Sequence, residues 1–125
     1  MSRPTGVVRA KDALGRMGEE VAARHLESEG FVVLERNWRC SEGELDILAR
    51  DGDTLVVCEV KTRSSTRYGS PFEAITERKL HRLERLGMRW MRERGVRPTR
   101  MRVDIVSVLA PPDGRRVIEH VRGLS

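Results

Sequence analysis

The sequence predicts a single α/β domain with a mixed central β-sheet flanked by helices, in the order α-β-β-β-α-β-β. Its 125 residues are enough for one domain with its own hydrophobic core. The composition, with 38% hydrophobic and 34% charged residues, is typical of a globular chain and excludes a disordered or membrane-embedded one. The hydrophobic period changes along the chain from helical to strand-like and back. This mixed order favours one sheet with helices packed on it.

The first helix is predicted from Asp12 to about Ser28. Asp12 is the expected N-cap, and Gly30 is the residue expected to end the helix. Residues 1–10 show no periodic pattern, so we expect a flexible N-terminal arm there and a single domain over residues 11–125. Apolar residues recur at steps of three and four, as one helix face requires: Leu14, Met17, Val21, Ala22 and Leu26.

Strand-like segments and one further helix follow. The third strand is apolar enough to lie at the centre of the sheet, and the turn residues Asp51-Gly52-Asp53 precede it. The second helix is predicted from about Pro71 to Arg94, where Gly95 and Pro98 stop it. The predicted strands are Phe31–Arg39, Glu44–Arg50, Leu55–Lys61, Met101–Leu109 and Arg116–Val121.

The charge balance favours a polyanionic partner. The chain has 24 Lys and Arg residues against 19 Asp and Glu, a net charge of +5. Cys40 and Cys58 form no CxxC motif and have no His at zinc-ligand spacing, so we expect free thiols and a reducing compartment. With no signal-peptide core and no apolar stretch of about 18 residues, the expected location is the cytoplasm, without membrane contact.

Charged residues of the second and third strands are predicted to meet on one face of the sheet. Strict alternation places Asp46 with Leu48 and opposite Leu45, and it places Glu59 with Lys61. A hairpin loop of two or four residues brings Asp46 to the face of Glu59 and Lys61, whereas a three-residue loop sends Glu59 to the other face. We expect an even loop, because the odd one scatters charges over both faces of a central strand.

Two converging carboxylates repel each other, and a divalent cation removes that repulsion. Mg²⁺ prefers oxygen ligands and takes one or two protein carboxylates. Asp46, Glu59 and the main-chain carbonyl of Val60 are therefore candidate metal ligands, and Lys61 is a candidate to stabilise charge developing on a phosphate. The alternative is an ion-pair cluster at a strand end, without a metal.

The segments GELDIL and LVVCEVKTR resemble the metal-binding Asp strand and the E-x-K strand of the PD-(D/E)XK nuclease superfamily. More narrowly, the chain resembles the YraN family of Holliday-junction-resolvase-like proteins over about residues 13–109. The matching stretches include GRMGEEVAARHLESEGF, ERNWRCSEGELDILARDGDTLVVCEVKTRSS, YGSPFEAITERKLHRL and VDIVSV. The proline of the motif name is absent, because Leu45 precedes Asp46, as is usual in resolvase-like members.

The resemblance implies a restriction-endonuclease-like fold and an endonuclease that depends on Mg²⁺ or Mn²⁺. It places the catalytic residues Asp46, Glu59 and Lys61 at the centre of the site. The implied substrate is DNA, with branched DNA among the candidates, and two cuts in a symmetric junction imply a homodimer. The alternative is a nucleic-acid-binding module of the same fold with weak or no catalysis.

Both helices offer further candidates. Glu19 falls at the edge of the apolar stripe of the first helix, where it can lean over the sheet, and the resemblance also places an acidic residue there near the metal. In the second helix Lys79 lies within the apolar stripe, so it must reach a carboxylate or a substrate phosphate, or extend its ammonium to water. The apolar stripe comprises Phe72, Ile75, Leu83, Leu86 and Trp90.

Arginines of the second helix recur at steps of four and three and form a basic stripe beside its core face. Such a stripe is suited to a phosphate backbone, and Arg63 and Arg67 in the preceding loop are placed to join it. The alternative is a solvated face with ion pairs to Glu77 and Glu84. The stripe comprises Arg78, Arg82, Arg85, Arg89 and Arg92, of which the first three, with Lys79, are the candidates nearest the expected site.

Overall fold

The computed structural model describes residues 10–67, 69–70, 72 and 75–124. The expected N-terminal arm lies outside these residues, except for Ala10, which is the first residue of a helix. The element order matches the predicted one. The elements are α1 (Ala10–Ser28), β1 (Val32–Cys40), β2 (Gly43–Asp51), β3 (Thr54–Arg63), α2 (Glu77–Arg94), β4 (Arg100–Leu109) and β5 (Val117–Val121).

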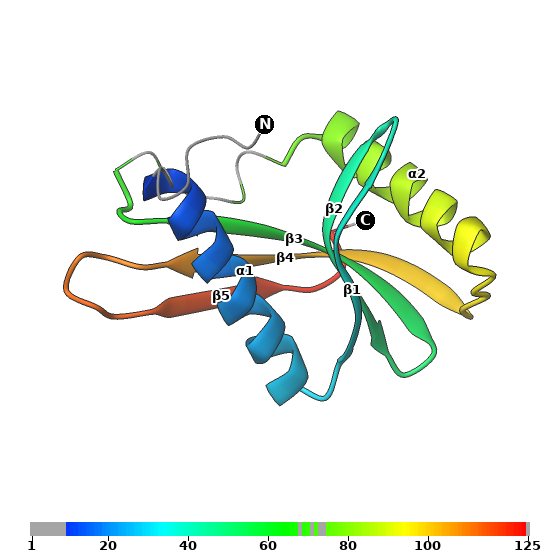
Figure 1. Cartoon of the computed structure of the whole chain (residues 1–125), viewed down its shortest axis with the longest axis horizontal. Helices are drawn as coiled ribbons and strands as arrows, with labels where there is room; N and C mark the ends of the chain where they lie inside the picture. The colour runs from blue at the N-terminus through cyan, green and yellow to red at the C-terminus, as the bar shows by residue number, and fades with distance from the viewer. Residues whose placement is uncertain (1–9, 68, 71, 73–74, 125) are drawn as a thin grey trace, which may run out of the picture.

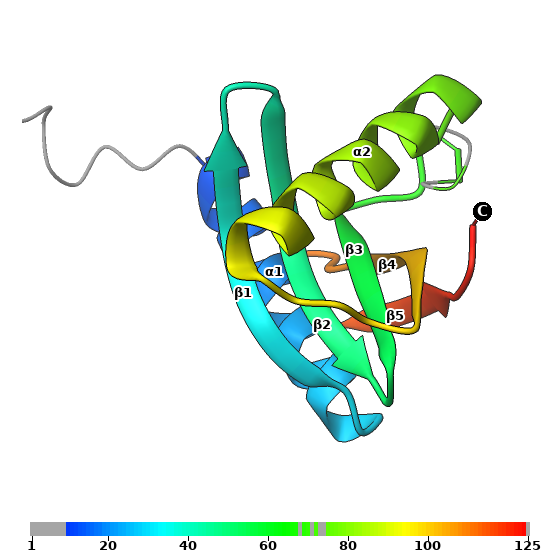
Figure 2. The ribbon, with the colours of Figure 1, turned by 90° about the vertical axis from the view of Figure 1, so that its right-hand side faces the viewer.

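The strands form one mixed sheet in the order β1-β2-β3-β4-β5, with β3 at the centre as predicted (Figure 1). Neighbouring strands are antiparallel except β3 and β4, which are parallel because α2 lies between them in the chain. The two helices pack on opposite faces of the sheet, α2 in front and α1 behind it in Figure 2. The resulting architecture is the predicted α/β fold.

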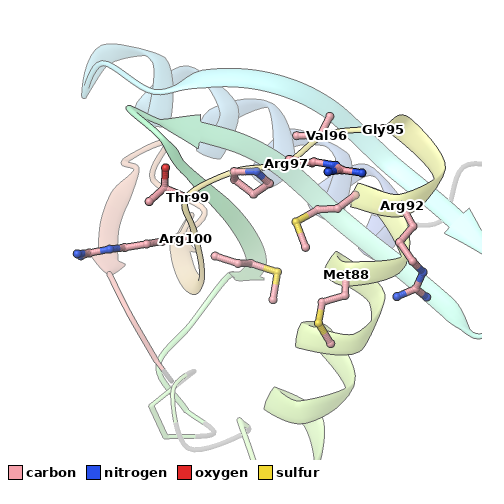
Figure 3. Close-up of a pocket in the computed structure, with 10 residues that line it drawn as sticks. Met88, Arg92, Gly95, Val96, Arg97, Thr99 and Arg100 are labelled. Carbon is pink, nitrogen blue, oxygen red and sulfur yellow. The ribbon is translucent and has the colours of Figure 1, made fainter.

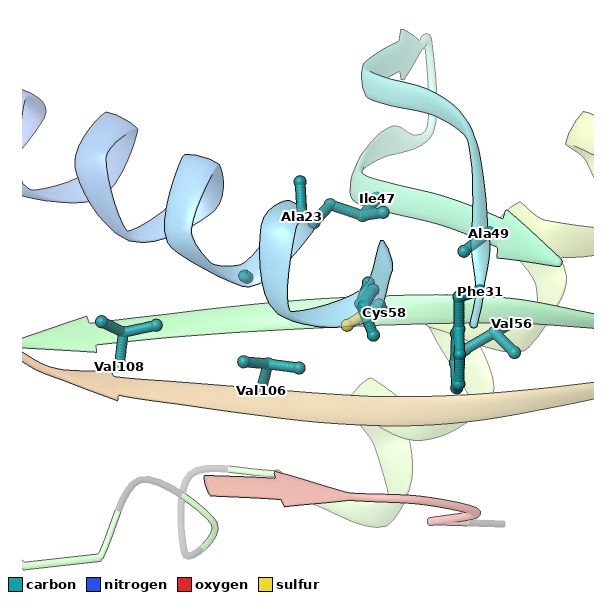
Figure 4. Packing of buried hydrophobic residues seen from close by; sticks show 10 residues of the cluster. Ala23, Phe31, Ile47, Ala49, Val56, Cys58, Val106 and Val108 are labelled. Carbon is teal, nitrogen blue, oxygen red and sulfur yellow. The ribbon is translucent and has the colours of Figure 1, made fainter. Parts of the chain in front are cut away.

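Each face of the sheet has its own hydrophobic core. On the α1 face, Ala22, Ala23 and Leu26 pack against residues such as Cys58 and Val106 (Figure 4). Cys58 is buried there, and Cys40 is half-buried; both are free thiols, as predicted. On the α2 face the core comprises Trp38, Leu45, Leu48, Leu55, Val57, Leu83, Leu86, Trp90 and Val103.

Both helices begin at residues that differ from the prediction. Asp12 lies inside the first turn of α1 and is not its N-cap. The helix α2 begins at Glu77, six residues later than predicted, because Thr76 caps it and its Oγ1 accepts a hydrogen bond from the Lys79 N–H at 3.1 Å. Phe72 is therefore half-buried ahead of the helix. Within the described residues, neither helix combines the length and apolarity needed to cross a bilayer.

The alternation of β2 breaks at Asp46, contrary to the prediction. Leu45 packs in the same core as Leu48, although strict alternation would place them on opposite faces. Opposite Asp46 in β1, Asn37 has φ of 53°, a left-handed conformation that interrupts the regular ladder. Beyond this point Trp38 of β1 and Leu45 of β2 both pack in the core on the α2 face.

Candidate functional site

The hairpin between β2 and β3 has the even loop that the sequence predicts. Arg50 pairs with Leu55 and Asp51 with Thr54, so only two residues form its tip. The regular ladder ends at Ile47 and Cys58, and the same register places Asp46 opposite Glu59. At this position the Oδ2 of Asp46 accepts a hydrogen bond from the Val60 N–H at 2.8 Å. The candidate site therefore lies where β2 departs from β3.

Glu59 is the centre of the site. Its carboxylate is 11% exposed and lies 2.7 Å from the Lys79 Nζ and 3.5 Å from the Lys61 Nζ. Lys79 comes from α2 and Lys61 from β3, so the ammonium groups approach Glu59 from two elements. The structure thus brings Asp46, Glu59 and Lys61 together, and it adds Lys79 as a direct partner of Glu59.

A small cavity of about 170 Å³ opens beside these groups. Asp46, Glu59 and Lys79 line it on the polar side, and Leu83 and Leu86 of α2 line it on the apolar side. A larger hollow, of about 590 Å³, lies at the other end of α2 and shares no residue with this cavity. We place the candidate site at the smaller cavity, because the converging carboxylates are there.

Burial and like charge act on the two carboxylates. Burial, together with the charge of Glu59, raises the pKa of Asp46 to about 7, although the Val60 N–H opposes this shift. Glu19 of α1 is close enough to add to the increase. Burial lowers the pKa of Lys61, and the Lys79 ammonium lowers it further. Burial also acts to lower the pKa of Lys79, but contact with Glu59 outweighs it and raises that pKa.

The donor set at the site fits a hard cation. Asp46 and Glu59 supply carboxylate oxygens, and the raised pKa of Asp46 shows that a positive charge near it would relieve an unfavourable interaction. Among the described residues no three His, Cys, Asp or Glu side chains form a ready-made metal-binding group. Two carboxylates are nevertheless within the number that Mg²⁺ takes from a protein.

The remaining candidates close to the strands occupy distinct positions. Val60 directs its N–H to Asp46, and its half-buried side chain packs on the α1 face. Glu19 is half-buried on α1, and no hydrogen bond or ion pair joins it to the other candidates in the described part of the chain. The preceding Gly18 packs so closely against Thr62 that a Cβ at this position would overlap the Thr62 side chain. This contact brings α1 close to the end of β3.

The arginine candidates differ in what they already contact. Arg78 and Arg85 are exposed, and Arg82 donates to the Glu42 carbonyl at 3.4 Å. Arg63 donates to the Gly69 carbonyl and Arg67 is exposed. The arginines of the predicted stripe therefore differ in whether they are already paired. Arg89 forms ion pairs with both Glu42, at 3.0 Å, and Glu93, at 2.9 Å.

A buried polar cluster lies on the α1 face around Asp104, a residue that the sequence indicates as a structural partner without indicating its contacts. Asp104 is fully buried and accepts hydrogen bonds from Arg102 and the Gly123 N–H, while the His120 Nε2 lies 2.9 Å away. The His25 ring stacks edge-on against His120, with ring centroids 5.4 Å apart. The only sequence signal for this cluster is the carboxylate of Asp104 within the apolar strand β4. Its partners lie elsewhere in the sequence, at no spacing that indicates a contact. The cluster lies on the face opposite Lys79.

The fold and this site define an α/β protein with a carboxylate–lysine cluster at the point where two strands diverge. The sequence profile described as "Uncharacterised protein family UPF0102" matches residues 18–108, and the chain belongs to this family. It is similar to a UPF0102 protein of a Nocardioides species, with 57% identity over 91% of this chain and 92% of the relative. A UPF0102 protein of Frankia alni is also 57% identical, over 93% of this chain and 97% of the relative.

Proposed function

We propose that this protein is a metal-dependent endonuclease that hydrolyses phosphodiester bonds of DNA, as its resemblance to the YraN family and the PD-(D/E)XK nucleases implies. The observation that carries the proposal is the convergence of Asp46 and Glu59 beside Lys61 and Lys79. These groups come from three elements, and the two half-buried carboxylates line the same cavity. Branched DNA is the substrate that the resemblance favours.

Each residue has a distinct role in this proposal. Asp46, Glu59 and the Val60 carbonyl would hold Mg²⁺ or Mn²⁺, which supplies Lewis-acid stabilisation of phosphate charge when bound. Lys61 would donate a hydrogen bond to the reacting phosphate, and its ammonium would stabilise the charge that develops there.

The arginines of α2 and of the loop after β3 would bind the flanking backbone. Arg78 and Arg85 are exposed beside the site and need to break no ion pair within the described residues. Arg82 has to exchange one long hydrogen bond to the Glu42 carbonyl for a phosphate. Contacts of this kind fix the position of the nucleic acid without reading its sequence.

A second candidate function is nucleic-acid binding without catalysis. The specific observation in its favour is the 2.7 Å contact between Lys79 and Glu59, in which the ammonium already balances the charge of one carboxylate without a metal ion. In this case the cluster stabilises the fold, and only the basic surface acts on nucleic acid. The two candidates predict the same binding and differ in metal-dependent cleavage.

A cleavage panel separates the two candidates. Labelled junction, flap, linear and single-stranded DNA are incubated with the full chain in Mg²⁺, Mn²⁺ or chelator, and Glu59→Gln is compared with Glu44→Gln. Glu44 lines the same cavity but pairs with the exposed Arg39, so it is the matched control. We expect Glu59→Gln to lose at least about a hundredfold in rate and Glu44→Gln to retain activity.

The other outcomes are equally informative. Cleavage that persists in Glu59→Gln and in Lys61→Met would identify a contaminating nuclease and contradict the proposal. Binding that weakens with salt, with no cleavage in either metal, would support the binding module. Circular dichroism of each variant shows whether the loss of activity accompanies a loss of fold.

A further inference from the structure

A hollow of about 590 Å³ lies between the C-terminal half of α2, the following loop and the start of β4 (Figure 3). Its floor and walls are apolar: Met88, Met91 and Met101 lie around it, and Val96 and Pro98 of the loop complete it. Met88 is 43% exposed, which is high for a large apolar side chain. The size of the hollow falls in the range of sites that bury a ligand.

The backbone that borders the hollow is held in place. Gly95 ends α2 in a left-handed conformation, with φ of 66°, and the Val96 N–H donates to the Met91 carbonyl at 3.0 Å. At the other end of the loop, the Thr99 N–H donates to the Asp53 carbonyl at 3.0 Å. The loop is thus anchored both to α2 and to the β2–β3 turn, so the shape of the hollow is already formed.

The edge of the hollow is positively charged. Arg92, Arg97 and Arg100 line it and are exposed, and no Asp or Glu is among its lining residues. Within the described part of the chain these three arginines form no ion pair, in contrast to the neighbouring Arg94, which pairs with Glu35 at 2.9 Å. A ligand with carboxylates would therefore meet three unpaired guanidinium groups.

We propose that this surface docks an acidic peptide segment of a partner protein, with one large apolar side chain inserted between the methionines. Methionines adapt to apolar side chains of different shapes, and the arginines complement the acidic residues around the inserted side chain. Nucleic acid fits less well, because no aromatic side chain lines the hollow and a base would have no stacking surface.

The surface extends beyond the hollow and is separate from the carboxylate site. A second hollow, of about 200 Å³, lies beside the same loop and includes Leu34, which is 41% exposed; because Asp53 also lines it, it suits an apolar rather than an acidic side chain of the peptide. The two hollows share Val96, Arg97, Pro98 and Thr99, so one peptide can contact both sides of the loop. The cavity beside Glu59 contributes no residue to either hollow, and this docking does not depend on nuclease activity.

Fluorescence anisotropy of the full chain with synthetic peptides tests the proposal. The first probe is a labelled peptide of roughly a dozen residues with Asp and Glu around one Leu and one Phe. In the second probe Asn and Gln replace the acidic residues, and in the third Ser replaces Leu and Phe. We expect only the first to bind well, and we expect its Kd to rise with salt.

Two variants locate the binding. Met88→Glu and Arg97→Glu are each expected to raise the Kd for the first peptide about tenfold. Arg16 is exposed on α1, away from the hollow, so Arg16→Glu should leave this Kd unchanged. Circular dichroism and thermal unfolding verify that each variant folds.

Three results would overturn the proposal. The first is that the acidic amphipathic peptide does not bind, or that Met88→Glu and Arg97→Glu both bind it as tightly as the wild type does. The second is competition for the hollow by a single-stranded oligothymidylate, which would make it a nucleic-acid site. The third is a wild-type dimer that Met88→Glu dissociates, which would identify a second copy of this chain as the occupant.

Discussion

Lys79 occupies one side of the Glu59 carboxylate that the proposed cation also needs. An ammonium and a divalent cation at the same oxygen compete, because both are stabilised by the same negative charge. At the proposed metal site the Lys79 ammonium would compete with the cation for Glu59, and once displaced it would be free to meet a phosphate. The proposed metal affinity would then include the cost of displacing Lys79.

Replacing Lys79 by Met is expected to raise Mn²⁺ affinity and lower stability. Without the ammonium, the Kd for Mn²⁺ should fall by about threefold to tenfold. The metal-free protein should lose about 1 kcal/mol of its free energy of unfolding, because a half-buried carboxylate loses a partner. Isothermal titration and urea unfolding measure the two effects, with Arg85→Met as the control on the same helix. A weaker Mn²⁺ affinity in Lys79→Met would contradict this expectation.

His25 makes the stability of the fold depend on pH. Burial, and then the nearby His120, lowers the pKa of His25, although Glu29 acts in the opposite direction. The unfolded chain takes up this proton near the usual pKa of 6.5 and the folded chain resists it, so stability is lost as the pH falls below about 6.5.

Unfolding in urea at about pH 7.5 and about pH 5.5 checks this sign. Asp46 acts in the opposite direction over the same range, because its pKa is raised to about 7 and the folded chain takes up a proton there. The contribution of His25 is therefore measured as the difference between the wild type and His25→Gln. On going to the lower pH we expect the variant to gain stability relative to the wild type, by less than about 1 kcal/mol because His25 is partly solvated. An unchanged difference in this variant would assign the pH dependence to other groups.

The glycines of α1 set how closely this helix approaches β3. A Cβ at Gly18 would overlap the Thr62 side chain, whereas a Cβ at Gly15 would meet no atom within 4 Å. Both residues belong to the same helix, so the two alanine variants share the same gain in helix propensity. They differ only in the contact with the sheet.

Gly18→Ala is expected to lower the free energy of unfolding by about 1–3 kcal/mol, because α1 must shift away from β3. Gly15→Ala should instead raise it by up to about 1 kcal/mol. Urea unfolding of both variants measures the difference. Equal changes in the two variants would show that the close contact at Gly18 does not constrain α1.

The elements were predictable from the sequence wherever the information is local. The strands begin and end within about two residues of their predicted bounds, because their period of two and the turn residues between them are local signals. The start of α2 was not predicted correctly, because Phe72 and Ile75 continue its apolar spacing ahead of the Thr76 cap.

The positions of Asp46, Glu59 and Lys61, though not their role, were predictable from local signals. The alternation of β3 and an even hairpin loop brought Asp46 to Glu59 and Lys61, but no local pattern predicted the left-handed conformation of Asn37 or the packing of Leu45 in the same core as Leu48. The cluster of Asp104 and His120 depends on pairing between β4 and β5, and its contact with His25 depends on the packing of α1. Such long-range contacts leave no spacing in the sequence.

At the scale of the whole molecule, some arginines form ion pairs with glutamates and others do not. Arg89 and Arg94 on α2 are held by glutamates, while Arg78 and Arg85 are exposed and unpaired within the described residues. The net charge of +5 therefore acts on a partner mainly through the unpaired groups. DNA affinity should report their number through its salt dependence.

Changing Arg78, Arg82 and Arg85 to Gln together is expected to weaken DNA binding and to reduce the slope of log K against log salt by about 2 to 3. Filter binding at about 50 to about 200 mM salt measures this slope. Three arginines elsewhere provide the control: Arg24, Arg115 and Arg116. An equal loss of slope in the control would indicate non-specific attraction to the whole molecule.

The homodimer implied by the resemblance is also testable at this scale. Sedimentation equilibrium should give twice the 14.3 kDa mass of one chain, and junction DNA should be cut on two strands within one complex. A monomeric mass at all concentrations, with single nicks as the only product, would favour a protein that acts on one strand.

The parallel pairing of β3 with β4 also has a consequence for synthesis on the ribosome. While the chain emerges, β3 can close its hairpin with β2 early, but its other edge waits until α2 and then Arg100–Leu109 have left the exit tunnel. During this interval an apolar strand stays open to neighbouring nascent chains. A chain that ends at Arg94 would keep Asp46, Glu59, Lys61 and Lys79, yet it would lack the strand that covers the open edge of β3, and we expect it to aggregate.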